Sequence, residues 1–366
     1  MKKIMEYILL LTCLLILSGC WDRQPLKDKG LAMVLGFDLT EDHELKITAS
    51  IPISEEKKKS SIFLSTVGRT PRDVRVKVDQ KTPDNVDPSK NTMVLIGKEL
   101  ANEDIYDILD VFYRNPKSAL NARLVISEEK ASVIIQKSLR DDKIPSEFLS
   151  HLLLNAEQTT SVVKEDLQST CTLIFDEGKD LTLPLLGLEG SEVEIKGLAM
   201  FHGKRMTGKL NQKESAMFLL LRNKLGKKSG FTEQVDPKKD DIASYVSFNV
   251  DDIKRKIDIN ISEDDNIRVK IDLDLKVTIT EYPKDHLYEE IVVNELNEKL
   301  SKKLTALANT VTKKMQQANC DAFEIGRRLI AFHNTTWKKL DWEKEYPRIK
   351  FDTNVTVNIV GNGIVN

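Results

Sequence analysis

Hydrophobic and polar residues alternate most regularly between residues 267 and 279. Every odd position of this run is apolar, which is typical of a strand with one buried face and one solvated face. The polar turn at 262–266 would join this strand to another at 257–261, and a strand is also predicted at 245–250. Apolar residues return at odd positions from 349 to 359, so we expect a last strand that rejoins the same sheet.

A different period fills the segment between these strands. Apolar residues spaced by three or four predict a long helix over 285–319. They are Val292, Leu296, Leu300, Leu304, Leu307, Val311 and Met315. Asp321 and Glu324 have the spacing of a capping box, which predicts a second helix through Phe332. Strand, strand, long helix and strand together predict an antiparallel sheet with a long helix across it.

The first half of the chain predicts strands that alternate with helices. Strands are expected at 31–37, 45–53, 93–96 and 124–126, and helices at 71–81, 99–113, 128–139 and 146–168, with a solvated loop at 54–61. A hairpin over 193–210 should turn at His202-Gly203, followed by a helix over 211–225 and a polar loop at 226–241. We therefore predict a multi-domain α+β protein whose mixed or antiparallel sheets are each packed by helices. Its N-terminal α/β region covers 20–190 as one or two subdomains, and its C-terminal α+β domain covers 191–366.

The N-terminus has the pattern of a lipoprotein signal peptide. Lys2 and Lys3 precede an apolar run over 8–17, which is too short to cross about 30 Å of hydrocarbon. Leu17-Ser18-Gly19-Cys20 has the form of a lipobox, so cleavage is expected between Gly19 and Cys20, removing residues 1–19. Cys20 would then carry an S-diacylglycerol and an N-acyl chain, and several acyl chains anchor a protein stably where one does not.

Composition narrows the remaining function classes. The chain has 55 Lys and Arg against 57 Asp and Glu, and this near-neutral, interspersed charge argues against nucleic-acid binding. No second stretch is long and apolar enough to span a membrane, so the anchor would be the lipid alone. Cys171 and Cys320 lie far apart in the sequence and are expected to be free, mostly buried thiols. The five histidines lack metal-ligand spacing, so neither a metal nor a cofactor is predicted.

The motifs that could carry chemistry are incomplete. Residues 203–209 match the GxxxxGK pattern of a phosphate-binding loop, but Leu210 stands where a Ser or Thr should bind Mg²⁺. The same residues fall in the predicted hairpin, where no strand leads directly into a helix. SxxK occurs at 54–57 and 127–130 without its companion motifs. Asp272 and Asp274 are interpreted as charges on the solvated strand face. We therefore predict no catalytic residues and no enzyme activity.

Two features near the C-terminus suggest structural roles. Trp337, Trp342 and Tyr346 form an aromatic cluster between the last helix and the last strand. This cluster is interpreted as a hydrophobic clasp that fixes helix to sheet, with a sugar-binding platform as the alternative. Gly326 falls inside the predicted last helix, where glycine costs about 1 kcal/mol relative to alanine. That glycine predicts the close approach of another backbone, for which the long preceding helix is a candidate.

Three segments together resemble the Ger(x)C family. They are CWD at 20–22, IKGLAMFHGKRMTGKL at 195–210, and QQANCDAFEIGRRL at 316–329 followed by Trp337, Trp342 and Tyr346-Pro347. The resemblance covers essentially the whole mature chain. One departure is visible, because the family usually has a glutamate shortly after CWD, where this chain has Gln24-Pro25.

The resemblance implies a non-enzymatic lipoprotein C subunit of a spore nutrient germinant receptor. Such a subunit would lie on the outer face of the inner spore membrane and assemble with two polytopic subunits, one of which senses nutrients. It implies a multi-domain α+β fold that is usually divided into three domains. No small-molecule ligand is predicted. Trp21, Asp22, Asp321, Gly326, Trp337 and Trp342 become candidates for structural or assembly roles.

Other classes of lipoprotein stay open. A solute-binding lipoprotein of an importer would need repeated βα units in two lobes, and a surface hydrolase would need a nucleophile or a metal site. A cell-wall-associated surface lipoprotein would use the aromatic cluster as a sugar platform. Neighbouring genes for two polytopic membrane proteins would favour the receptor subunit, and genes for an ATPase and a permease would favour the importer.

Overall fold

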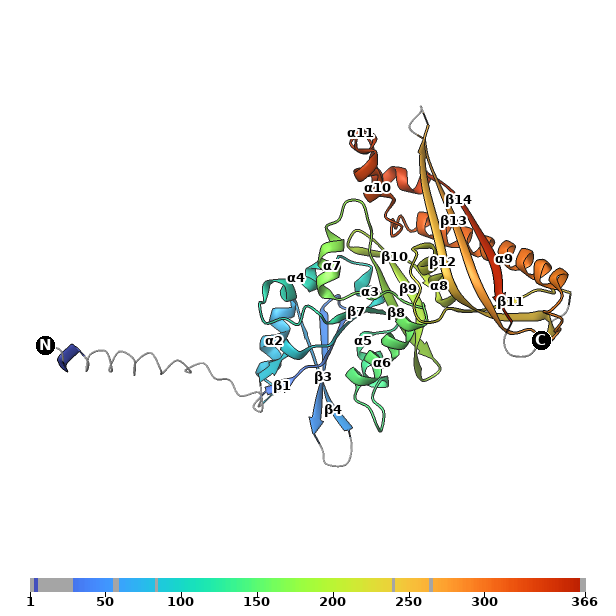
Figure 1. Ribbon diagram of the computed structural model, residues 1–366. Helices are drawn as coiled ribbons and strands as arrows, with labels where there is room; N and C mark the ends of the chain where they lie inside the picture. The colour runs from blue at the N-terminus through green and yellow to red at the C-terminus, as the bar shows by residue number, and fades with distance from the viewer. Residues whose placement is uncertain are drawn as a thin grey trace.

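The computed structural model describes residues 3–5, 29–54, 59–82, 85–238, 241–262 and 266–362. The predicted cleavage site and lipidated Cys20, together with Trp21 and Asp22, lie outside these residues. Two layered units follow one another along the chain: an eight-stranded sheet with helices on both faces, and a four-stranded sheet crossed by one long helix (Figure 1). The predicted α+β class is therefore confirmed.

The first sheet has the strand order β10-β9-β8-β7-β6-β2-β3-β4. Its centre is parallel, from β2 through β6 and β7 to β8, and both of its edges are antiparallel hairpins. The strands are β2 (Val34–Leu39), β3 (Leu45–Ser54), β4 (Lys59–Gly68), β6 (Met93–Gly97), β7 (Arg123–Ser127), β8 (Thr182–Glu189), β9 (Glu192–His202) and β10 (Arg205–Asn211). A separate parallel pair joins β1 (Lys29–Leu31) to β5 (Asn85–Asp87).

Helices cover both faces of this sheet because its central strands are buried on both faces. Met93 and Leu95 point into one hydrophobic core, and Val94 and Ile96 into another. The first face is packed by α5 (Ala131–Lys137) and α6 (Pro145–Gln158). The second is packed by α2 (Pro71–Asp79), α4 (Tyr106–Arg114) and α7 (Leu167–Ile174), with the short α3 (Lys98–Ala101) after β6. A strand with two buried faces has no alternation, as the sequence of β6 shows.

The second sheet has the order β11-β12-β13-β14. Its strands are β11 (Gly230–Gln234), β12 (Tyr245–Ile261), β13 (Ile267–Glu281) and β14 (Lys350–Gly361), and α9 (Glu290–Gln317) crosses it. The prediction of a wholly antiparallel sheet is wrong in one strand, because β14 runs parallel to β13. The chain returns along α9 to the end of the sheet where β13 began, as a strand–helix–strand crossover requires.

One hydrophobic core joins the two units. The core on the α5 and α6 face of the first sheet continues through α8 (Gln212–Leu221) to the inner face of β12, β13 and β14 and to α9. Every residue of α8 from Glu214 to Leu221 is buried. The predicted division after residue 190 falls in the turn between β8 and β9, which pair with one another in the first sheet. Residues 192–211 therefore belong to the first sheet by hydrogen bonding.

Several predicted elements have different limits in the structure. The helix expected over 99–113 is broken into α3 and α4, because the Asp104 side chain accepts from the Tyr106 amide at 2.8 Å and starts a new helix. The segment 146–168 likewise contains α6 and then a turn before α7. The predicted loops at 54–61 and 226–241 contain the start of β4 and all of β11, and β12 is one continuous strand with a bulge between Val250 and Asp252.

Short helical segments complete the described chain. They are three 3₁₀ turns at Pro88–Lys90, Ile242–Ser244 and Tyr346–Arg348, and the helices α10 (Ile325–Phe332), α11 (Asn334–Trp337) and α12 (Trp342–Glu345). The last three helices and the final turn connect α9 to β14. Among the described residues, no helix combines the length and the apolarity needed to cross a bilayer.

Candidate functional site at the junction of the two units

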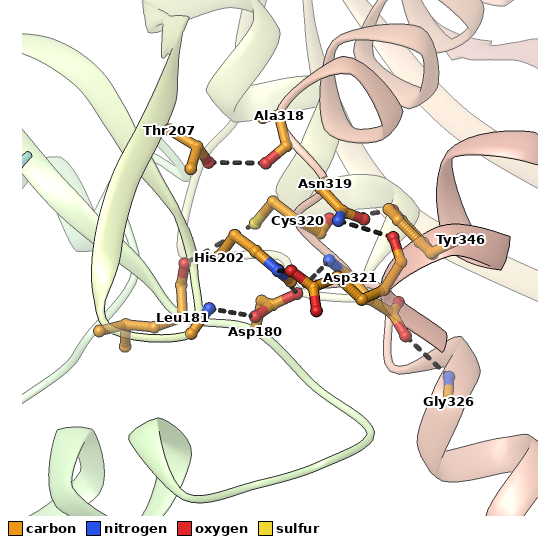
Figure 2. A network of polar contacts seen from close by, with 12 residues as sticks. Asp180, Leu181, His202, Thr207, Ala318, Asn319, Cys320, Asp321, Gly326 and Tyr346 are labelled. Carbon is orange, nitrogen blue, oxygen red and sulfur yellow. Dashed lines mark hydrogen bonds and ion pairs between the residues drawn. The ribbon is translucent and has the colours of Figure 1, made fainter. Parts of the chain in front are cut away.

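A network of polar contacts joins the two units beside the β9–β10 hairpin (Figure 2). The first unit contributes the loop between α7 and β8, which holds Gly178 and Asp180, and the tip of the β9–β10 hairpin. The second unit contributes the segment between α9 and α10, which holds Cys320 and Asp321. We call this set of contacts the junction network. It contains two of the residues singled out from the sequence, Asp321 and Gly326.

Asp180 and Asp321 hold the two segments together through backbone and side-chain bonds. The Asp321 amide donates to Asp180 Oδ2 at 2.8 Å, and the Asp180 amide donates to the Asp321 carbonyl oxygen at 3.1 Å. The other carboxylate oxygen of Asp180 accepts from the Gly203 amide at 2.9 Å, at the hairpin tip. One side chain thereby fixes both the hairpin and the segment after α9.

The Asp321 carboxylate is buried and begins α10. Its oxygens accept hydrogen bonds from the Ile325 amide at 3.0 Å and the Gly326 amide at 2.7 Å. Two of the amides that have no partner within the helix are thereby hydrogen-bonded. Burial is the main cause that raises the pKa of this carboxyl well above its ordinary value, and the two amides oppose the shift. Disturbing this buried, hydrogen-bonded carboxyl would be costly, because it would leave buried polar groups without partners.

The predicted capping box between Asp321 and Glu324 is wrong in its geometry. Glu324 has a left-handed backbone with φ of 66°, and its carboxylate bonds Lys179 and Arg222, each at 2.9 Å. The Asp321 amide is bound by Asp180, which leaves no amide there for Glu324. Asp321 therefore caps α10 from four residues before its first residue, Ile325. Its own amide is held by Asp180 of the other unit.

Gly326 meets another backbone closely, as its place in the helix predicted. The neighbour is Gly178 of the first unit and not the long helix α9. A Cβ atom at position 326 would lie 2.8 Å from Gly178 Cα, and one at position 178 would lie 2.5 Å from the Arg327 amide nitrogen. The Arg327 amide donates to the Gly178 carbonyl oxygen at 2.9 Å, and the Arg327 guanidinium binds Asp176. Two facing glycines thus allow a backbone contact between the units.

His202 lies at the tip of the hairpin between carboxylates of both units (Figure 2). Its Nδ1 is 3.7 Å from Asp180 Oδ2, an ion-pair distance longer than a hydrogen bond, and its Nε2 is 3.4 Å from Glu343 Oε1. The interaction with Asp180, foremost, and that with Glu343 raise the pKa of His202, although partial burial opposes the shift. The protonated imidazole is the form that this site favours.

The aromatic cluster packs beside the junction network, and Tyr346 is its most buried member. Tyr346 is 1 % exposed and its hydroxyl donates to the Cys320 carbonyl oxygen at 2.9 Å. The ring of Trp342 lies 5.6 Å from that of Tyr346 and 5.5 Å from that of Trp337, between ring centres. Both tryptophans are half-buried. Trp342 therefore packs against Tyr346, and Trp337 packs against Trp342.

The chemistry of this network is structural. Cys320 is free and fully buried, and burial raises the pKa of its thiol well above the ordinary value, which keeps it in the unreactive protonated form. Cys171 is also free. In the described part of the chain, no group of three His, Cys, Asp or Glu side chains is arranged to hold a metal ion. Residues 203–209 form the turn and start of β10, and Lys209 pairs with Glu128.

Sequence reasoning missed Gly178, Asp180 and His202. The signal that could have found the first two is the short acidic loop DEGKD at 176–180, with a glycine between charges directly before a buried strand. His202 was recognised only as a turn residue. The contribution of all three depends on a contact between segments more than 100 residues apart, and no local pattern encodes such a contact.

Comparisons with known proteins agree with this architecture. Residues 22–188 match the family model of the spore germination protein N-terminal domain, and residues 196–363 match that of the spore germination B3/GerAC-like C-terminal domain. The crystal structure of the GerBC protein superimposes with a TM-score of 0.59 at 17% identity, covering 89% of this chain and 97% of that chain. This likeness shows that the two proteins share a fold.

Curated relatives align over the whole chain. Spore germination protein GerQC of Bacillus cereus is 22% identical, and the alignment covers 98% of this chain and 99% of that protein. Spore germination protein KC of Bacillus subtilis is 22% identical, with 100% of this chain and 97% of that protein covered. Spore germination protein B3 of Bacillus subtilis is 20% identical with both chains fully covered. The two matching family models between them span both structural units, and the chain belongs to the Ger(x)C family of germination-receptor C subunits.

Proposed function

We propose that this chain is the lipid-anchored, non-catalytic C subunit of a nutrient germinant receptor. It would be held on the outer face of the inner spore membrane and assemble there with two polytopic subunits. The observation that carries the proposal is the match to both family models, which between them cover residues 22–188 and 196–363 and so include both units. A match to only one of the two family domains would not support this proposal.

The anchor in this proposal is the lipid on Cys20. The lipobox at 17–20 supports it, and the described helices offer no membrane-spanning alternative. The first strand of the described chain, β1, begins at Lys29. Nine residues of chain reach at most about 30 Å, so lipidation at Cys20 would keep the whole body close to the membrane surface. Such a tether raises the local concentration of the body near membrane-embedded partners.

A scaffolding role fits the chemistry of the junction network. Its buried acids are occupied by backbone amides, and its buried thiol is held in the protonated form. These contacts fix the orientation of one unit relative to the other. A subunit that binds two partners at once needs such a fixed geometry, because avidity is lost when both sites cannot be engaged simultaneously.

Affinity capture of the full chain from detergent-solubilised spore membranes tests this proposal. We expect two polytopic membrane proteins to be recovered with the tagged chain in comparable molar amounts, measured by quantitative mass spectrometry. A strain that carries the tag on an unrelated spore lipoprotein is the matched control. Recovery of an ATPase and a permease would instead identify an importer, and recovery of no membrane protein would contradict assembly.

A further inference from the structure

A second feature, next to the junction network, is a basic cavity between the two units. Its volume is about 720 Å³, and it is lined by the loop after α6, the end of α8, and parts of β12 and α10. Six of its lining residues are cationic, whereas three carry carboxylates. Cavities of roughly 300–1,000 Å³ are the usual size of small-molecule sites.

Arg255 is an unusual residue for its place in β12. It alternates with Ile253 and Ile257, on the side of the strand that packs against the core, whereas Lys254 and Lys256 are exposed. A cation on an apolar strand face is costly unless a partner compensates its charge. Arg255 Nη1 donates to the Leu221 carbonyl oxygen at 3.1 Å, which satisfies one donor and leaves the charge without a counterion.

The acids of the cavity do not neutralise Arg255. Glu324 bonds Lys179 and Arg222, whose side chains are 10% and 12% exposed. Glu157 pairs with Arg123, outside the cavity lining. Within the described residues, no carboxylate lies within ion-pair distance of Arg255 or of Arg328, which also lines the cavity.

The electrostatic environment of Arg255 agrees with this excess of positive charge. Burial, first, and then the neighbouring guanidinium groups of Arg328 and Arg222 lower its pKa, and Glu324 only partly opposes them. Like charges that share a half-buried site repel one another and weaken the fold. Sites that lower stability in this way are typical of places where a ligand supplies the missing partner.

We propose that this cavity binds a small oxyanion, a carboxylate- or phosphate-bearing molecule, between Arg255 and Arg328. The planar guanidinium fork matches the two oxygens of a carboxylate or a phosphate, and each such bond is stronger than one between neutral groups. The bound anion would contact the first unit through Lys179 and the second through Arg255, and so would strengthen the connection between them. This site does not depend on the receptor role proposed above.

Calorimetric titration of the full chain in a neutral detergent tests the proposal. Inorganic phosphate and succinate are the two probes, at an ionic strength held constant with sodium chloride. We expect saturable binding of at least one probe below about 10 mM, and about tenfold weaker binding in Arg255→Gln and in Arg328→Gln, as the loss of one charge-assisted bond predicts. Lys254→Gln removes the same charge from the exposed face of β12 and should leave binding unchanged.

The outcome also identifies the ligand class. Binding of phosphate alone indicates a phosphate-bearing ligand, binding of succinate alone a carboxylate, and binding of both a general oxyanion site. No saturable binding of either probe would overturn the proposal, as would equal weakening in Lys254→Gln.

Thermal unfolding without any probe gives an independent test. We expect Arg255→Gln to melt at a higher temperature than the unsubstituted chain, because an uncompensated charge has been removed from an apolar face. The probe that binds should raise the melting temperature of the unsubstituted chain and not that of the variant. A lower melting temperature in Arg255→Gln, with the response to the probe retained, would show that Arg255 serves the fold and contradict the site.

Discussion

Gly178 and Gly326 bring the backbones of the two units into direct contact. A Cβ atom on Gly326 would lie 2.8 Å from Gly178 Cα, a distance that real Cβ atoms essentially never show. The adjacent Arg327 amide donates to the Gly178 carbonyl oxygen at 2.9 Å. The absence of a side chain at both positions is therefore what lets the acidic loop of the first unit lie against the start of α10.

Gly326→Ala should destabilise the protein, although alanine normally stabilises a helix by up to about 1 kcal/mol relative to glycine. Forcing a methyl group into this contact should cost about 1–3 kcal/mol, since neither backbone can move without breaking the bonds of Asp180 and Asp321. Chemical denaturation of the purified chain measures the difference in the free energy of unfolding.

Gly230→Ala is the control for this substitution. The nearest atom to a Cβ at position 230 is Asn249 Oδ1 at 3.4 Å, which is an ordinary van der Waals distance. We expect a much smaller change there. If Gly326→Ala were as stable as the unsubstituted chain, the contact between Gly178 and Gly326 would not require a glycine at position 326.

The protonation of His202 should make the junction more stable at lower pH. Its folded-state pKa is raised above 6.5, chiefly by Asp180, so its contribution is fully present below the unfolded value and is lost as pH rises through the folded value. His202→Gln should therefore lose more stability at about pH 6 than at about pH 8. Thermal melts across this range measure the effect, and His151→Gln on the exposed face of α6 is the control. An equal loss at both pH values would contradict the ion pairs of His202.

Tyr346 should be more important for stability than either tryptophan of the aromatic cluster. Tyr346→Ala empties a fully buried site and should cost about 3–5 kcal/mol. Tyr346→Phe removes only the hydroxyl bound to the Cys320 carbonyl and should cost about 1–3 kcal/mol. Trp337→Ala should cost less stability than Tyr346→Ala, because Trp337 is only half-buried.

Spore membranes offer the corresponding measurement in the cell. Loss of folded protein should lower the amount of this subunit and of its receptor partners, and the variant with the largest loss of stability should show the largest decrease. Quantitative blotting measures these amounts. Normal levels together with lost binding to peptidoglycan in Trp337→Ala would instead support the sugar-platform alternative.

Lys209→Ala should leave both stability and germination nearly unchanged. Lys209 lies in β10 and pairs with Glu128 at the surface, and exposed substitutions of this kind usually change stability by less than about 0.5 kcal/mol. Calorimetry with ATP should detect no binding. Measurable ATP binding that this substitution abolishes would show that residues 203–209 act as a phosphate loop after all.

The elements that sequence reasoning found best are those whose pattern is local and one-sided. β13 has strict alternation because its outer face is solvated, and α9 has a continuous apolar stripe because only one side packs on the sheet. β4 and β11 were missed because they are edge strands with many polar residues. The parallel pairing of β14 with β13 could not be predicted either, since alternation within a strand is the same in both directions.

Only part of the junction network could be predicted from the sequence. A glycine inside a helix correctly predicted that some backbone comes close to Gly326, but the identity of Gly178 depends on how two units pack. Asp321 was correctly chosen as a helix cap, whereas its partner Asp180 lies 141 residues earlier. Arg255 interrupts an apolar strand face, and that signal became informative only after the structure showed which face is buried.

The central claim is that Cys20 is lipidated. Substitution of this cysteine tests the claim most directly. We expect Cys20→Ala to leave the precursor uncleaved, to lower the amount of this subunit in the inner spore membrane, and to reduce germination in response to nutrients. Cys171→Ala, which removes a free thiol within the folded body, is the matched control and should behave like the unsubstituted chain. Mass spectrometry of the mature N-terminus, together with membrane fractionation and a germination assay, provides the measurement. A diacylglycerol-modified Cys20 whose loss abolishes membrane retention is the predicted result. An unmodified mature protein that germinates spores normally would contradict the account.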